Sequence, residues 1–357
     1  MATPTPTLAP TRTSTATSTE TCISAVPDRY GHVPPGSCDS YYEFYPSFGG
    51  NLAFAVLFGL STLVHLAQAI AFKKRFCWVV IMGSVWETAA FIIRVLGTRD
   101  QQQMQYAIWG QLLFLLAPLW INAFVYMTVA RMVHFGLPSQ KIWGIRAARM
   151  TLLFVWLDIA CFLVQGAGGS MLSGDSPANV QRIGSKLYMS GVGLQLGFVL
   201  IFIVLTVCFY RDVSRVTGGR MGLMRWLTLT MIAVLLFIVM RIVYRLIEFS
   251  PGAGRDNPLL TSEIYPFILD AFPMLVGLVL LNVMHPGFVL RGPDSEFPRL
   301  TRAEKKAIKA QKKEDKRRRK EERKRGKAGS AVSEYALTDD MRRGTGSESD
   351  WERPPRV

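Results

Sequence analysis

The stretch NLAFAVLFGLSTLVHLAQAIAF, residues 51–72, contains no Asp, Glu, Lys or Arg. An α-helix rises 1.5 Å per residue, so about 20 apolar residues match the roughly 30 Å hydrocarbon core of a bilayer. The only strongly polar side chains after Asn51 are His65 and Gln68. The stretch therefore predicts a helix that spans a membrane.

The same pattern recurs along the chain, which is 50% hydrophobic and has a positive mean hydropathy of +0.22. Each run is long enough to cross the hydrocarbon core, and polar segments separate the runs. The chain is therefore predicted to be an all-α membrane protein with a seven-transmembrane helix bundle. The predicted spans are about 49–72, 77–97, 107–133, 150–172, 188–210, 222–247 and 265–290.

Basic residues alternate between the two sides of the predicted bundle. Loops after the first, third and fifth spans are rich in Lys and Arg, whereas the intervening loops are poorer in basic residues or balance them with acids. Cytoplasmic loops carry an excess of Lys and Arg. The pattern predicts an N-terminus outside the cell and a cytoplasmic C-terminus. The basic residues of the first group are Lys73, Lys74, Arg75, Lys141, Arg146, Arg149, Arg211, Arg215, Arg220 and Arg225.

Two polar segments flank the predicted membrane domain of 49–290. Residues 1–48 begin with a Ser-, Thr- and Pro-rich stretch, are predicted to be extracellular, and show no signal-peptide pattern. Residues 291–357 form a predicted cytoplasmic tail, largely disordered or partly helical, whose basic run at 302–327 contributes to the net charge of +15. The run could contact anionic inner-leaflet lipids, or set topology or trafficking. Nucleic acid is not an expected partner.

Five cysteines divide between these regions. Cys22 and Cys38 lie in the segment predicted to be extracellular, where oxidising conditions favour a disulfide. Two free thiols are the alternative. Cys77, Cys161 and Cys208 lie in apolar runs and are expected to be packing residues.

Charged side chains interrupt several of the spans. A charge that faces lipid at the bilayer centre costs about 3 kcal/mol or more, so such residues usually face the bundle interior or a polar cavity. Glu87 and Arg94 are seven residues apart, which places them on one helix face, two turns from each other. Each is therefore expected to point into the bundle and to find its partner on another helix. Asp158 and Gln165 have the same spacing in the fourth span.

The sixth span ends in a stripe of charged residues, Arg241, Arg245 and Glu248, at helical spacing. Together with polar residues of the other spans it predicts a polar pathway for a substrate. Some of these side chains could instead hold the bundle together by interhelical hydrogen bonds, and those near span ends could snorkel to the interface. The pathway residues are Glu87, Arg94, Asp158, Gln165, Gln195, Arg241, Arg245, Glu248, Glu263, Asp270, His65 and Gln111.

Glycines cluster where the fourth span ends and the fifth begins, in QGAGG (165–169) and GVGLQLG (191–197). Small residues let two helices approach closely. They could equally allow unwound backbone that lines a cavity.

An ordered set of motifs resembles the fungal lipid-translocating exporter family. ETAAFIIR (87–94) is similar to the family's Glu-x-x-Gly-Tyr-x-x-Arg, although Ala90 and Phe91 stand where Gly and Tyr are usual. The resemblance covers about residues 41–288. The other matching segments are YEFYPSFGGNLAFAVLF (42–58), LLFLLAPLWINAFVYMTVAR (112–131), DIACFLVQGAGG (158–169), GVGLQ (191–195), YRLIEFSPGAGRDNPLLTSEIYPFILDAFPML (244–275) and HPG (285–287).

The resemblance implies a multi-pass plasma-membrane protein that exports or flips sphingoid long-chain bases or related toxic amphiphiles. A sphingoid base has an ammonium headgroup, so Glu87, Asp158 and Asp270 are expected to receive the cation. Arg94 and Arg241 are then expected to neutralise these acids when the site is empty. No Walker A pattern is present, and neither an enzymatic activity nor a cofactor or metal is expected. The oligomeric state is left open.

Two other classes of function compete with this hypothesis. A seven-span receptor or membrane-stress sensor, which binds a lipid without moving it, fits the topology equally well. An intramembrane lipid hydrolase is suggested by Ser61 and His65, which are four residues apart. A zinc site needs further ligands, and the chain contains only four histidines and no His-x-x-x-His pair.

Overall fold

The computed structural model describes residues 25–34, 37, 41–42, 44–172, 176–250 and 262–290, with scattered residues between 307 and 322. Cys22, Cys38 and most of the basic run lie outside the described residues, so the disulfide stays a prediction. The long helices are α1 (Phe48–Phe72), α2 (Trp78–Arg99), α3 (Met104–Gly136), α4 (Ala147–Ser170), α5 (Ala178–Val216), α6 (Leu223–Glu248) and α9 (Phe272–Val283).

Short elements complete the bundle. The 3-10 turn Arg75–Cys77 leads into α2, and α8 (Ile264–Pro266) with the π-helical turn Phe267–Ala271 leads into α9. Seven helical segments of the described chain are long and apolar enough to cross a membrane, and the last of them extends over Ile264–Phe288. The predicted all-α, seven-span architecture is therefore confirmed.

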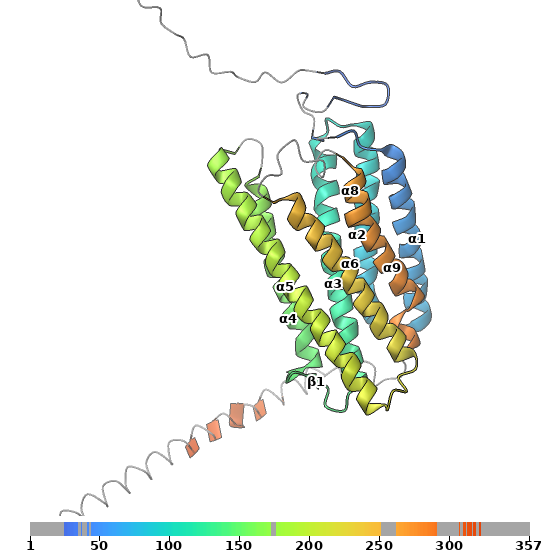
Figure 1. The fold of residues 1–357 in the computed structure, drawn as a ribbon, viewed down its shortest axis with the longest axis vertical. Coiled ribbons are helices and arrows are strands. Elements are labelled where there is room, and N and C mark those ends of the chain that lie inside the picture. The colour runs from blue at the N-terminus through green and yellow to red at the C-terminus, as the bar shows by residue number, and fades with distance from the viewer. Residues whose placement is uncertain are drawn as a thin grey trace, which may run out of the picture. The chain divides into compact units, whose positions relative to one another are not determined.

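The helices pack in a closed order, each against its neighbour in sequence (Figure 1). The last span closes the order, because α9 packs against both α6 and α1. Helix α3 is the most central and contacts α2, α4, α5 and α6. We call the two ends of the bundle the Phe48 end and the Phe72 end, after the first and last residues of α1.

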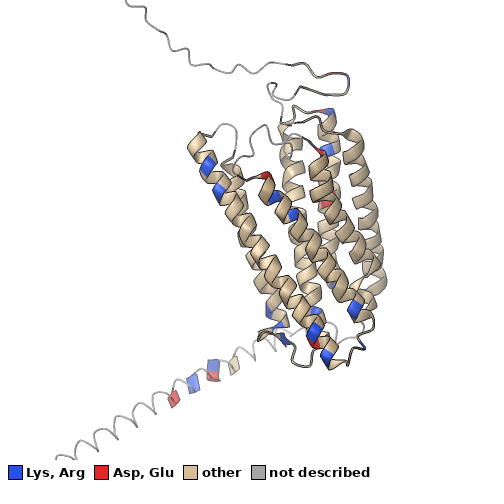
Figure 2. Ribbon diagram, viewed as in Figure 1, with Lys and Arg blue, Asp and Glu red and all other residues tan. Residues whose placement is uncertain are grey.

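The loops with the basic residues of the predicted inside all lie at the Phe72 end, where Lys and Arg gather in the ribbon (Figure 2). This placement follows because two spans, an even number, lie between successive basic loops. Which side of the membrane the Phe72 end faces stays a prediction from the positive-inside rule.

Two elements differ from the sequence prediction. Helix α5 has 39 residues and continues well beyond the predicted span 188–210, because polar helix-forming residues extend it at both ends. The loop between α3 and α4 forms a hairpin of β1 (Lys141–Ile142) and β2 (Ile145–Arg146). Its turn residues Trp143 and Gly144 both have positive φ, as a two-residue type I′ turn requires.

The glycines between α4 and α5 serve close helix approach. Both helices run through them without unwinding. A Cβ at Gly168 would overlap the backbone nitrogen of Tyr188, and one at Gly191 would press on the carbonyl oxygen of Cys161. The alternative of unwound, cavity-lining backbone is therefore wrong.

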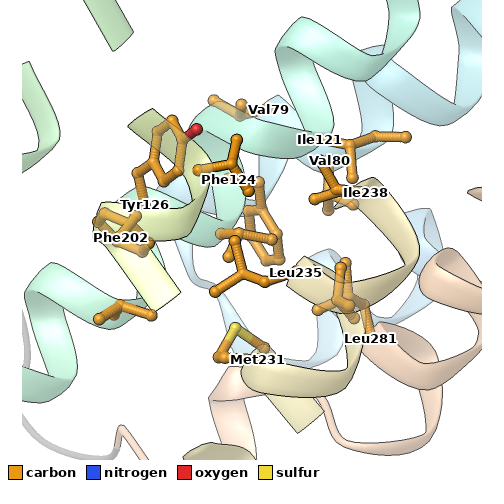
Figure 3. Packing of buried hydrophobic residues seen from close by; sticks show 14 of the residues in the cluster. Val79, Val80, Ile121, Phe124, Tyr126, Phe202, Met231, Leu235, Ile238 and Leu281 are labelled. Carbon is orange, nitrogen blue, oxygen red and sulfur yellow. The ribbon is translucent and has the colours of Figure 1, made fainter. Parts of the chain in front are cut away.

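An apolar core fills the bundle, and Figure 3 shows part of it. Aromatic rings from three helices meet there: the ring centroids of Tyr126 and Phe202 are 4.4 Å apart, and those of Phe154 and Phe202 are 4.9 Å apart. Met231 and Leu235 of α6 and Leu281 of α9 complete the cluster and are completely buried. Close packing of this kind is what holds helices together in lipid.

Candidate functional site

A buried charged cluster joins α6 to the last span near the Phe48 end. Asp270 is completely buried and pairs with two arginines of α6: with Arg241, and with Arg245 at 2.5 Å. Arg245 also pairs with Glu248 at 3.0 Å, and the Tyr244 hydroxyl donates a hydrogen bond to the same carboxylate. Buried charges are tolerated only when paired, and the ion pairs of this cluster supply that pairing.

The π-helical turn Phe267–Ala271 carries Asp270. Pro273, two residues beyond it, has no backbone N–H, and its ring would clash with the carbonyl four residues earlier in a regular α-helix. The wider turn accommodates that proline, and the backbone N–H of Phe272 bonds to the carbonyl oxygen of Phe267 instead. The local sequence around Pro273 thus sets the direction from which Asp270 faces α6.

A second proline supplies an acceptor for Arg241. Pro118 lies inside α3, so the carbonyl of Phe114 receives no hydrogen bond from position 118. Arg241 donates to this carbonyl oxygen at 3.1 Å. The Ala-Pro segment of the third span therefore contributes a backbone ligand to the charged cluster.

The ring of Phe114 is the common neighbour of three guanidinium groups. The ring centroid lies 4.5 Å from Arg94, 5.3 Å from Arg241 and 5.6 Å from Arg245. A cation above an aromatic face is attracted to it, most strongly where water is excluded. Phe114 therefore helps to hold three like charges in one small region.

Glu87 lies in the bundle interior with no hydrogen-bond partner for either carboxylate oxygen among the described residues. Its side chain is completely buried. The charged groups that act on it are Arg241, Arg245 and Asp270 of the charged cluster, and Arg94, which lies two turns along its own helix. An unpartnered carboxyl in such a place is unusual and marks a candidate functional residue.

Asp158 belongs to a separate polar site between α3 and α4. One of its oxygens accepts hydrogen bonds from the Asn122 amide and the Tyr126 hydroxyl, both at 3.0 Å. Two turns further along α4, the Gln165 amide donates a hydrogen bond to the Gln195 amide oxygen of α5 at 2.9 Å. These contacts are interhelical hydrogen bonds between neutral groups and one acid.

A narrow space of about 40 Å³ lies between α3, α4, α5 and α6. It brings both glutamines, Asn122, Arg241 and Arg245 to one surface. That volume holds one or two water molecules and no lipid headgroup. Four of the predicted pathway residues therefore line one common space that is too small to be an open channel: Gln165, Gln195, Arg241 and Arg245.

A larger pocket of about 450 Å³ opens at the Phe48 end, and we call it the Arg94 pocket. Arg94 is half-buried and donates a hydrogen bond of 2.7 Å to the Gln111 side-chain oxygen. Across the pocket, Glu263 accepts hydrogen bonds from the Ser47 backbone at 2.5 Å and the Asn51 amide at 2.7 Å. Glu263 therefore fastens the last span to the start of α1.

Burial affects two groups of this pocket that lie outside the spans. It raises the pKa of the Glu263 carboxyl, while the hydrogen bonds from Ser47 and Asn51 oppose that effect. Burial likewise raises the pKa of the Tyr42 hydroxyl, against the attraction of nearby Arg94. Both groups therefore favour their neutral forms more than they would in water.

The remaining predicted residue, His65, lies apart from the charged cluster. It is buried between α1 and α9, and neither ring nitrogen has a hydrogen-bond partner among the described residues. Ser61, one turn before it, accepts a hydrogen bond from Asn282 at 2.9 Å. Within the described ranges, no three His, Cys, Asp or Glu side chains lie close enough to hold a metal ion.

Several residues of the site carry no charge and were not among the predicted pathway residues. Phe114 and Pro118 act through a ring and a freed carbonyl, and Asn122 and Tyr126 act through Asp158. A proline four residues after a carbonyl is the one signal that could have pointed to Phe114. Nothing in the sequence alone identifies Tyr126 as the partner of Asp158.

The chain matches the family model described as RTA1-like protein over residues 80–293. It is 43% identical to a protein of Emericella nidulans named "Probable lipid transporter atnI", with 80% of this chain and 77% of the relative covered. No solved structure matches the chain.

Two more distant relatives come from Saccharomyces cerevisiae. One is named "Sphingoid long-chain base transporter RSB1" and is 23% identical, covering 72% of this chain and 76% of the relative. The other is "Protein RTM1", also 23% identical, covering 70% and 92%. These matches confirm the resemblance inferred from the motifs. The chain belongs to the RTA1-like family.

Proposed function

We propose that this chain transports amphiphilic lipids across a membrane, with sphingoid long-chain bases as the first substrates to test. The names of its relatives support lipid transport. The observation that carries the proposal is Glu87, a completely buried carboxyl without a hydrogen-bond partner in the described bundle. An ammonium headgroup would supply the missing partner.

The three acids that the sequence analysis expected to receive the cation differ in how available they are for it. Asp270 is held by Arg241 and Arg245, so its charge is already neutralised. Asp158 has one oxygen occupied by two hydrogen bonds and the other unpartnered in the described structure. Glu87 is therefore the acid best suited to receive a cation, and Asp158 is a second binding position for it.

The lipid tail can stay in the hydrocarbon while the headgroup passes along the polar residues of the bundle. The central space of about 40 Å³ is too small for a headgroup. The helices must therefore separate during transport, and the described arrangement is a closed one. Movement of packed helices against one another is a common way to open such a site.

The same closed arrangement favours one alternative, a receptor that binds an amphiphile at the Phe48 end without moving it.

We propose that the transporter lies in the plasma membrane with the N-terminus outside and the basic tail near the anionic inner leaflet, in line with the distribution of Lys and Arg. In that orientation the Arg94 pocket faces the cell exterior.

The test is leaflet exchange in vesicles that contain the purified full-length chain. A labelled sphingoid base is followed beside a labelled phospholipid, with protein-free vesicles as the background. The wild-type chain should speed exchange of the base well above background, and Glu87→Gln should lower the protein-dependent rate at least about tenfold, since an amide cannot neutralise the ammonium.

Asp100→Asn is the matched control, because Asp100 is an exposed acid at the end of the same helix. It should keep the wild-type rate. Exchange by Glu87→Gln at the wild-type rate would remove the role of Glu87. Binding of the base by wild-type protein without any exchange would establish the receptor alternative.

A further inference from the structure

The Arg94 pocket lies where α1 begins, α2 ends and α3 begins, at the Phe48 end of the bundle. Its wall combines the polar side chains of Arg94, Gln111 and Glu263 with apolar ones. Ile108, on the wall from α3, is about half exposed. The pocket therefore combines polar groups with an apolar side chain that remains accessible.

Both acids of the pocket are already satisfied. Glu248 pairs with Arg245 at 3.0 Å and accepts a hydrogen bond from Tyr244. Glu263 accepts one hydrogen bond on each carboxylate oxygen, from the Ser47 backbone and from Asn51. Neither acid needs a cation from a ligand.

Arg94 is not satisfied in the same way. In the described part of the chain it forms no ion pair, and its hydrogen bond goes to a neutral amide oxygen, that of Gln111. The rings of Phe91 and Phe114 lie beside it, and Glu263 and Tyr42 of the pocket attract it without forming an ion pair with it in the described structure. A guanidinium has five N–H donors, and the described structure uses one nitrogen of Arg94, so donors remain for a ligand in the pocket that Arg94 lines.

We propose that the Arg94 pocket binds the anionic group of a single-chain amphiphile, a phosphate or a carboxylate, with Arg94 as its charged ligand. The guanidinium offers two parallel donors to such a group. The Gln111 amide nitrogen is a further donor, because its oxygen is used by Arg94. The choice of an amphiphile rests on the proposed function and on the half-exposed Ile108 at the pocket wall.

This assignment sets a preference among long-chain bases. A base esterified with phosphate carries an anionic group beside its amine, whereas the unmodified base carries only the cation. The pocket should therefore favour the phosphate ester over the free base. Bidentate pairing to a guanidinium that is partly shielded from water accounts for the expected size of the preference.

The experiment measures binding to the purified full-length chain in phosphatidylcholine nanodiscs, after subtraction of binding to empty nanodiscs. The probes are a long-chain base, its phosphate ester and a fatty acid of equal chain length, together with inorganic phosphate. The ester should bind at least about tenfold more tightly than the free base, and inorganic phosphate should compete only weakly.

Variants then assign the preference to Arg94. Arg94→Gln should bind ester and free base equally, and Arg94→Lys should keep part of the preference, because it retains the charge and loses the fork geometry. Arg99→Gln is the control, since Arg99 is an exposed arginine on the same helix. It should behave as the wild type.

Equal affinity of the wild-type chain for ester and free base overturns the proposal, as does an unchanged preference in Arg94→Gln. If inorganic phosphate competes as well as the ester, the pocket is a site for small anions and the lipid part is wrong. If Arg94→Gln does not fold, Arg94→Lys and the wild-type comparison decide. Preferential binding without leaflet exchange would remove the proposed transport and leave the pocket assignment intact.

Discussion

The two halves of the bundle both contain packed aromatic rings, and they differ in their buried charges. Toward the Phe48 end, the interior holds charged groups that pair across helices and border an open pocket. The rest of the core is formed by buried aromatic and aliphatic side chains, such as Phe124, Phe202 and Leu235 (Figure 3). Under the proposed transport, the first half would receive the headgroup, and the second would have to rearrange to let it pass.

The difference also separates two kinds of cohesion. The charged half depends on a few strong partnerships, each of which leaves a buried charge behind when it is broken. The apolar half depends on many weak contacts, each of which leaves only a void. Substitutions in the two halves should therefore differ in both stability and transport.

The largest effect should come from the charged half. Asp270→Asn leaves Arg241 and Arg245 buried without their common counter-charge, and should lower the free energy of unfolding by roughly 3–5 kcal/mol. Thermal unfolding of the purified protein in detergent measures the loss. Asp212→Asn removes an exposed acid whose contact with Arg215 is 4.0 Å, and should change stability by less than about 0.5 kcal/mol. Similar losses in both variants would contradict the comparison.

A somewhat smaller effect is expected in the apolar half. Phe202→Ala removes a completely buried ring between Tyr126 and Phe154, and should cost about 3 kcal/mol because the surrounding side chains cannot fill the void. The same unfolding measurement applies. Ile201→Ala, on the neighbouring exposed position of α5, is the control and should be nearly neutral. If Phe202→Ala unfolded with the same free energy as the wild type, the prediction of close packing in this half would be wrong.

The smallest effect concerns pH. Burial raises the pKa of Glu263 above its value near 4.5 in the unfolded chain, so its ionised form is disfavoured in the folded state. Its contribution to stability should be greatest below that pH and should decline as pH rises through the raised pKa. Glu263→Gln should remove this decline in melting temperature. A slope unchanged by the substitution would assign the pH dependence to another group.

The sequence predicted the seven spans well because apolar runs of the required length have no other stable use. It also indicated that Glu87 and Asp270 would lie inside, since a charge facing lipid is expensive. It did not predict their partnerships. The chain offers Arg94, Arg241 and Arg245 as possible partners, and only the packing of α6 against the last span selects two of them for Asp270.

Two other features could not be predicted from the sequence, the length of α5 and the Arg94 pocket. The apolar run that marks the fifth span ends where the lipid ends, but helix propensity continues, so α5 is much longer than the span. The Arg94 pocket depends on the segment before α1 folding over the ends of α2 and α3, a contact between residues distant in sequence. Hydrophobic periodicity contains no information about such contacts.

The π-helical turn Phe267–Ala271 makes the exact number of residues in the last span important. A π-turn holds one more residue than the α-turn it replaces. Loss of one residue there would convert the wide turn into a regular α-turn, leave the residues on both sides on nearly the same faces, and keep the span equally apolar. It would also press the ring of Pro273 against the carbonyl four residues before it, a clash that the wider turn avoids. Single-residue deletions in these five positions should therefore be tolerated less than hydropathy alone suggests.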